Sequence, residues 1–144
     1  MRIYLASSWR NPHQQHVVGL LRLAGHLVYD FREPNGDGEI GFQWSEIDPN
    51  WKRWSPAQFI EGLRHPVAVR GCSRDMAALI EADACILVLP CGRSAHLELG
   101  IANGMGKRTA ILLSGDDEPE LMYATCDAVC ESLEKVLALP WMQA

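Results

Sequence analysis

Residues that can do chemistry gather in two short segments of the chain, 6–12 and 91–98. In the second segment, Gly92 permits a close approach to the backbone and Arg93 supplies a fixed cation. We expect Ser94 to cap a helix whose first free N–H groups favour an anion. The combination predicts a cradle for a phosphate or hydroxyl group, although its spacing matches neither the P-loop nor the dinucleotide fingerprint.

The same predicted helix carries a carboxylate, Glu98, four residues after Ser94. At this spacing Glu98 lies in the first turns of the helix and can face the same cleft as the cradle. A glutamate near a helix N-terminus also has an ordinary structural role, because it complements the helix dipole and can close a cap. The residue types alone therefore leave two interpretations open, a reactive carboxylate and a stabilising one.

Alternating strands and helices are expected to position these segments. Strands are predicted over 2–6, 26–31, 84–89, 109–113 and 127–129, and the continuous apolar run 84–89 is typical of a central strand. Helices are predicted from Pro12 to Gly25, from Ser55 to about His65, from a cap at Ser73 through Ile80, and over 95–105, 119–125 and 131–139.

This order of elements predicts an α/β fold with a flavodoxin-like or Rossmann-like, doubly wound, five-stranded parallel sheet. The length favours a single domain spanning 1–144. Ligands of such sheets lie beyond the carboxyl ends of the strands, and segments 6–12 and 91–98 both follow strands there.

A long polar segment, 32–54, interrupts the alternation with glycines, prolines and four large aromatic residues, which are Phe42, Trp44, Trp51 and Trp54. Loops of this length in compact domains are usually lids or binding loops, and a tryptophan ring can serve as a platform for a base. The alternative is that the rings form a satellite core beneath the loop. The sequence leaves both interpretations open.

Composition excludes several classes of partner. The net charge of −5 comes without a basic block, so we expect a small ligand and no polymeric nucleic acid or membrane surface. The apolar run 84–90 is far too short to span a membrane, and Met1 leads directly into a predicted strand instead of a signal peptide.

The five cysteines include no Cys-x-x-Cys pair and no zinc spacing. We therefore expect reduced thiols in a cytoplasmic protein. Cys85 is predicted to lie in the core, whereas Cys91 follows the central strand and either packs there or touches substrate.

Three stretches of the chain together resemble the nucleoside 2-deoxyribosyltransferase superfamily. They are Ile3-Tyr4-Leu5-Ala6-Ser7, the predicted helix with Asp75 and Asp83, and Ser94-Ala95-His96-Leu97-Glu98-Leu99-Gly100. The superfamily includes deoxyribosyltransferases and deoxynucleoside monophosphate N-glycosidases. The resemblance spans most of the chain and implies a flavodoxin-like fold, a nucleoside or nucleotide ligand, no metal or organic cofactor, and a homodimer or larger homo-oligomer.

The resemblance also implies catalytic roles. Glu98 would be the nucleophile that attacks the anomeric carbon of the sugar, giving a covalent glycosyl-enzyme. Tyr4 would orient that carboxylate, and its alternative is an aromatic residue at the edge of the core. Asp75 would help protonate the leaving base, and its alternative is an ordinary carboxylate in the second turn of its helix. Asp83 is predicted to be a structural turn residue.

Further residues are expected to bind substrate, with Met122 supplied to the site of a neighbouring subunit. The set is Ser7, Arg10, Trp44, Gly92, Arg93, Ser94 and Met122. Arg10 and Arg93 would hold a 5′-phosphate or sugar hydroxyls through charge-assisted hydrogen bonds, or they are solvated surface charges.

Two departures from the superfamily pattern bear on the reaction. The transferases commonly have an acidic residue where this chain has Gly92, which favours a hydrolase slightly over a transferase. The Trp-rich segment also differs from the usual loop and is expected to reshape the pocket. Two other functions stay open, a non-catalytic nucleotide-binding or sensing module on the same fold and, less favoured, a flavin-binding electron carrier.

Overall fold

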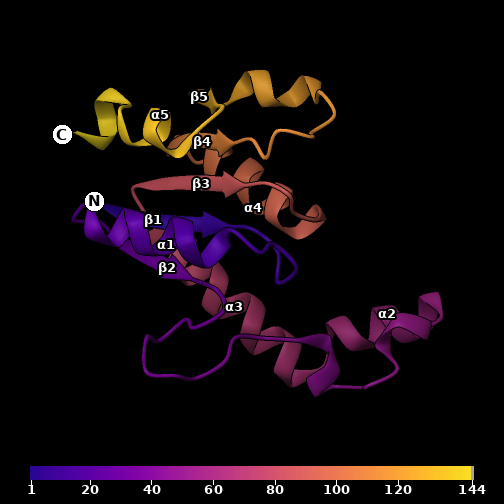
Figure 1. Ribbon diagram of the computed structural model, residues 1–144. Helices are drawn as coiled ribbons and strands as arrows, with labels where there is room; N and C mark the ends of the chain where they lie inside the picture. Colours follow the sequence, from indigo (N-terminus) through magenta and orange to yellow (C-terminus); the bar gives the residue numbers. More distant parts are fainter. Residues whose placement is uncertain (144) are drawn as a thin grey trace. The chain divides into compact units, whose positions relative to one another are not determined.

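The computed structural model describes residues 1–143, and its chain divides into two compact units (Figure 1). Unit 1 comprises Met1–Asp30 together with the chain from Leu79 onward, and unit 2 comprises Phe31–Ala78. Unit 1 contains the sheet and unit 2 the Trp-rich segment. The single domain expected over 1–144 stays a prediction.

Unit 1 is built on five parallel strands in the order β2-β1-β3-β4-β5. They are β1 (Arg2–Ala6), β2 (Leu27–Asp30), β3 (Ala84–Val88), β4 (Arg108–Leu112) and β5 (Ala128–Cys130). Every residue of β3 is buried, as its unbroken apolar sequence predicts. The order confirms the predicted flavodoxin-like sheet, with its topological switch point between β1 and β3.

Helices cover both faces of the sheet. Apolar residues of α1 (Gln14–Leu23) and α5 (Leu133–Leu137) form one core cluster with alternate sheet residues such as Ile3, Leu5 and Ile86. Tyr4 and Cys85 alternate with those residues along β1 and β3, so their side chains point to the opposite face. The helix α4 (Arg93–Gly104) packs against β3, β4 and β1.

Unit 2 contains two 3-10 turns, η1 (Trp44–Glu46) and η2 (Trp51–Arg53), the helix α2 (Pro56–Leu63), and the helix α3 (Pro66–Glu81) as far as Ala78. The ring of Trp44 packs edge-on against Phe42 and Trp54, with centroids 4.8 and 5.7 Å away. The indole of Trp54 donates to the carboxylate of Asp48 at 2.6 Å. These contacts match the satellite-core interpretation of the aromatic residues.

One helix boundary was wrong in the sequence prediction. Helix α3 begins at Pro66, and Ser73 lies inside it instead of capping it. His65 provides the start, because its Nδ1 accepts from the backbone N–H of Val67 at 3.1 Å and Pro66 needs no N–H partner. The final helix is also shorter than 131–139 and is followed by a 3-10 turn, η4 (Pro140–Met142).

The other short element near the C-terminus, predicted over 119–125, is the 3-10 turn η3 (Leu121–Thr125). Among residues 1–143, no helix has the length and apolar character needed to cross a bilayer.

Candidate functional site

The loop after β1 is held against the carboxyl end of β3 by buried polar contacts. The Ser7 hydroxyl donates to the carbonyl of Val88 at 2.9 Å, and the Asn11 amide donates to the same carbonyl at 3.1 Å and to Ser7 at 3.0 Å. The Asn11 carbonyl oxygen accepts from the backbone N–H of His13 at the start of α1. Ser7, predicted to bind substrate, thus has a structural role at the switch point.

The loop after β3 leads into α4 with Gly92 as the N-cap, so the prediction that Ser94 caps this helix was wrong. No side chain caps the helix, and Ser94 is its second residue. The backbone of Gly92 is extended, and the helix starts at Arg93, two residues earlier than expected. A Cβ at Gly92 would meet nothing within 4 Å, so the loop leaves open space at this point.

The side chain of Glu98 lies on the sheet-facing side of α4. The buried residues of the helix are Ala95, Leu99 and Ala102, and Glu98 falls on the same stripe, three residues after the first and one before the second. Glu98 itself is half-buried. A carboxylate in this place departs from the apolar pattern of a helix face packed on a sheet.

The charge of Glu98 contributes to raised pKa values at two cysteines. Burial raises the pKa of Cys91 to about 12, and the negative charges of Glu98 and then Asp117 add to the shift. Burial and the charge of Glu98 also raise the pKa of Cys85 on β3. Glu98 therefore lies near both the middle strand and the loop that follows it, and neither thiol is ionised near neutral pH.

Tyr4 is fully buried on the same face of the sheet. It is the register partner of Cys85 across β1 and β3, and its ring stacks on Tyr29 with centroids 5.2 Å apart. Tyr4 and Glu98 are thus both neighbours of Cys85. Asp83, by contrast, accepts from the backbone N–H of Arg2 at 2.7 Å at the amino ends of the strands, which agrees with a structural role.

A contact that the sequence did not reveal joins α4 to η3. The ring of His96 stacks on Tyr123, with Nε2 2.7 Å from the Tyr123 hydroxyl and Nδ1 2.8 Å from the Gly92 carbonyl. Burial, and then nearby negative charge such as that of Glu120, raise the pKa of Tyr123. No local pattern links residues 27 positions apart, so only the fold brings these rings together.

The remaining predicted site residues lie on the surface of unit 1 or in unit 2. Arg10 and Arg93 are exposed, and neither forms an ion pair with another residue of 1–143. Met122 on η3 is 69% exposed. Trp44 and Asp75 are half-buried in unit 2, and Asp75 lies in the middle of α3 instead of in the second turn of a helix.

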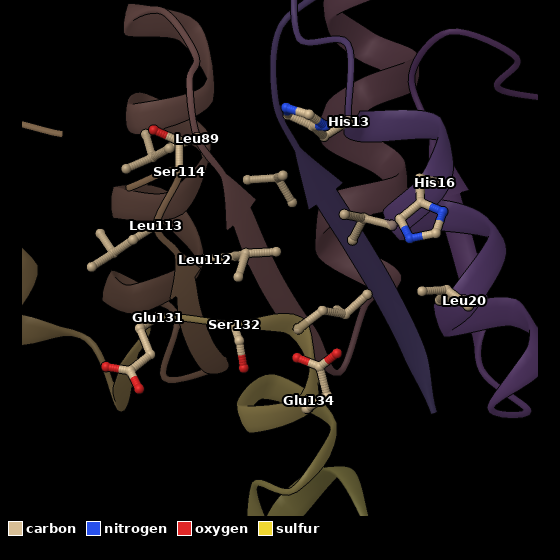
Figure 2. A pocket seen from close by; sticks show the side chains of 13 residues that line it. His13, His16, Leu20, Leu89, Leu112, Leu113, Ser114, Glu131, Ser132 and Glu134 are labelled. Atoms are coloured by element: carbon tan, nitrogen blue, oxygen red, sulfur yellow. The ribbon is translucent and has the colours of Figure 1, made fainter. Parts of the chain in front are cut away.

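A separate cavity of about 290 Å³ opens between α1 and α5, on the other face of the sheet from α4 (Figure 2). His13 and His16 line one side and Glu131 and Glu134 the other. Glu131 is paired with Lys135 at 2.6 Å. Within residues 1–143, no group of three or more His, Cys, Asp or Glu side chains is arranged to hold a metal ion.

Comparison with solved structures finds the same fold in other proteins. A 2-deoxyribosyltransferase from the psychrotolerant bacterium Bacillus psychrosaccharolyticus matches with a TM-score of 0.69 and 22% identity, over 99% of this chain and 95% of that one. A conserved protein from Enterococcus faecalis V583 matches with a TM-score of 0.60 and 12% identity, over 95% of this chain and 94% of that one.

A CMP N-glycosidase from Clostridium botulinum matches with a TM-score of 0.50 and 16% identity, over 95% of this chain and 96% of that one. No protein-family model and no curated protein sequence matches the chain. The structural likenesses confirm the fold that the resemblance to the nucleoside 2-deoxyribosyltransferase superfamily implied.

Proposed function

We propose that this chain cleaves or transfers the N-glycosidic bond of a nucleoside or nucleoside 5′-monophosphate, with Glu98 as its nucleophile. The observation that carries the proposal is the half-buried carboxylate on the sheet-facing stripe of α4, beside the switch point of the sheet. A stabilising glutamate would be expected on the solvent side of the helix, where its desolvation costs nothing. Two enzymes of this chemistry share the fold.

In the proposed reaction, a Glu98 oxygen attacks the anomeric carbon and the bond from that carbon to the base nitrogen breaks. The base leaves with the bonding electrons and takes a proton, which Asp75 supplies. Water then attacks the same carbon, and the bond from that carbon to Glu98 breaks. The proton that the water loses passes to the side chain of Asp75, which was left deprotonated by the first step. Two inversions at one carbon give net retention.

Tyr4 is proposed as the residue that orients the Glu98 carboxylate. Its place beside Cys85, whose pKa is raised by burial and then by the charge of Glu98, supports the assignment. Ser7, Gly92, Ser94, Arg10 and Arg93 are proposed to line the sugar or phosphate side of the site. The two exposed arginines offer charge-assisted hydrogen bonds to an anion.

Trp44 is proposed to contact the base, and Met122 to enter the site of a neighbouring subunit in a homo-oligomer. The strong exposure of Met122 and its neighbour Leu121, at 85%, supports burial against a second chain. The proposal includes a cytoplasmic location, where the five cysteines, all free within residues 1–143, would stay reduced.

Hydrolysis is proposed ahead of transfer, because Gly92 stands where the transferases commonly carry an acidic residue. The test is incubation of the protein with a panel of nucleosides and nucleoside monophosphates, followed by chromatography for free base. Adding a second base to the same reactions distinguishes transfer from hydrolysis. We expect free base from at least one substrate, and Glu98→Gln should abolish its release.

The matched control is Glu81→Gln, which removes an exposed carboxylate at the amino edge of the sheet and should leave base release unchanged. The alternative function, a nucleotide-sensing module, predicts binding of a panel member by calorimetry without release of base. That result, with an affinity that Glu98→Ala changes little, would replace the enzymatic proposal.

A further inference from the structure

Two hydrogen bonds in series connect Gly92, His96 and Tyr123 at the start of α4. Nδ1 of His96 is 2.8 Å from the carbonyl oxygen of Gly92, the N-cap, and Nε2 is 2.7 Å from the Tyr123 hydroxyl. The two rings are nearly parallel, at 14°, with centroids 5.7 Å apart. The structure therefore gives each ring nitrogen an oxygen partner, and the Sγ of Cys91 lies farther from Nδ1, at 3.7 Å.

Proton positions in this chain follow from the acceptor. A carbonyl oxygen can only accept, so Nδ1 of His96 carries the hydrogen and donates to Gly92. In a neutral imidazole Nε2 is then an acceptor, and the Tyr123 hydroxyl donates to it. The pKa of Tyr123 is raised by burial first and also by nearby negative charge such as that of Glu120, which keeps its hydroxyl protonated. Each donor in the chain thus has one acceptor.

The contact supplies a restraint that the N-cap lacks. Gly92 has no side chain to cap α4, and nothing packs within 4 Å of its Cβ position. Glycine has more backbone freedom than any other residue, so this loop is free to move unless another group holds it. The imidazole of His96 holds the Gly92 carbonyl from within the first turn of the same helix.

The same hydrogen bonds connect α4 to η3. Tyr123 belongs to η3 and directly follows Met122, whose carbonyl accepts from the Thr125 hydroxyl at 2.8 Å. The amide of Asn103 near the end of α4 donates to that hydroxyl at 3.2 Å. Helix α4 therefore holds η3 at two points, one in its first turn and one in its last.

We propose that His96 and Tyr123 are positioning residues that fix the start of α4, and with it the Glu98 carboxylate, against η3. The inference rests on the proposed function, since Glu98 is the group being positioned. A carboxylate that must meet one carbon atom loses rate when its helix shifts, whereas ground-state binding of the substrate depends on many contacts.

Three variants distinguish the contributions of the ring stacking and of the two hydrogen bonds of His96. Tyr123→Phe keeps the stacked ring and removes the hydroxyl. His96→Ala removes both hydrogen bonds. His96→Asn places an amide nitrogen about where Nδ1 stands, so that it can still donate to Gly92. The matched control is His16→Asn, an exposed histidine on α1.

The first measurement needs no activity. Hydrogen exchange followed by mass spectrometry reports the protection of the backbone amides of residues 92–98. We expect exchange there to become about tenfold faster in His96→Ala, to stay close to that of the unmodified protein in His96→Asn, and to rise in η3 for Tyr123→Phe. His16→Asn should change neither segment.

The second measurement is base release. We expect kcat to fall about 10- to 100-fold in His96→Ala with a much smaller change in KM, and to be largely restored in His96→Asn. Unchanged exchange and unchanged kcat in both His96→Ala and Tyr123→Phe would overturn the inference. If the unmodified protein releases no base, the proposed function fails while the exchange experiment still decides whether the restraint exists. If His96→Ala does not fold, Tyr123→Phe decides alone.

Discussion

At the scale of single residues, two side chains near the carboxyl ends of the strands are candidate nucleophiles. They are the carboxylate of Glu98 and the thiol of Cys91. A thiol reacts as its thiolate, and the pKa of Cys91 is raised to about 12 by burial and by the charges of Glu98 and Asp117. The electrostatics that disfavour the thiolate are thus caused in part by the proposed nucleophile.

This relation predicts the pH dependence of Cys91 modification. With a pKa of about 12, about one Cys91 thiol in 10,000 is ionised at pH 8, so alkylation by iodoacetamide should be slow and should still be rising at pH 10. Glu98→Gln removes a negative charge that raises this pKa, so the pKa falls and alkylation at a given pH becomes faster. Peptide mapping by mass spectrometry measures the rate.

The control for that experiment is the urea-unfolded chain, in which burial and Glu98 no longer act on Cys91. Its alkylation should be much faster at pH 8. Equal rates for Cys91 in the folded and the unfolded chain would show that burial does not suppress its thiolate, and equal rates in the folded protein with and without Glu98→Gln would show that Glu98 does not act on this thiol.

A second residue-scale prediction concerns Gly92. A Cβ there meets nothing within 4 Å, and the backbone lies at φ −93° and ψ −163°, which any residue can adopt. Gly92→Asp should therefore fold with a melting temperature within a few degrees of the original, because surface changes are usually worth about ±0.5 kcal/mol. It should raise the ratio of base transfer to hydrolysis.

The measurement is product analysis with a labelled acceptor base. An unchanged ratio in a well-folded Gly92→Asp variant would show that the missing acidic residue does not set the balance between the two reactions.

At the scale of elements, the strands and most helices could be predicted because each depends on its own local pattern. The run 84–89 is apolar throughout and forms the central strand, and Ser55-Pro56 carries the cap of α2. Helix α3 could not be predicted in full, because its start depends on a His65 side chain acting as a cap. Ser73 resembled a cap only in residue type.

The parts of the site that depend on local sequence could also be predicted, and the parts that depend on the fold could not. Glu98 and the two loops follow from local sequence and from the rule that ligands lie at the carboxyl ends of parallel strands. The contact of His96 with Tyr123, and the buried amide of Asn11 that ties two loops together, depend on chain segments brought together by the fold. No spacing within one element signals such contacts.

Unit 2 allows a test of packing at the scale of one helix. A Cβ at Gly62 in α2 would clash with the ring of Trp54, whereas a Cβ at Gly19 in α1 would meet nothing within 4 Å. Gly62→Ala should destabilise the chain by about 1–3 kcal/mol through overpacking, since the indole is held by Asp48. Gly19→Ala should be neutral or stabilise by up to about 1 kcal/mol, because alanine favours a helix.

Urea unfolding of the two variants measures the difference, with Trp fluorescence and far-ultraviolet circular dichroism as probes. Equal stabilities would mean that Trp54 moves aside without cost, and the aromatic cluster would then be too loose to serve as a core.

At the scale of the whole molecule, the outer side of α4 is unusual for a protein that works alone. Leu97, Ile101 and Met105 recur every four residues and are all exposed, Leu97 to 68%. Gly100 and Gly104 leave open space beside them, so a second helix could approach closely. Exposed apolar surface of this kind marks interaction sites, and a second copy of this chain is the partner that also explains an exposed Met122.

The homo-oligomer proposed for this chain therefore predicts a specific weak point. Ile101→Glu places a charge in the middle of the apolar face and should reduce the mass measured by light scattering to that of one 16.0 kDa chain. Base release should fall together with the mass, because Met122 would no longer reach a neighbouring site. Leu23→Glu is the control, since Leu23 is 84% exposed on α1, away from α4, and should keep both mass and activity. If the unmodified protein is already a monomer at tens of micromolar and still releases base, the site is complete within one chain and Met122 has no part in it.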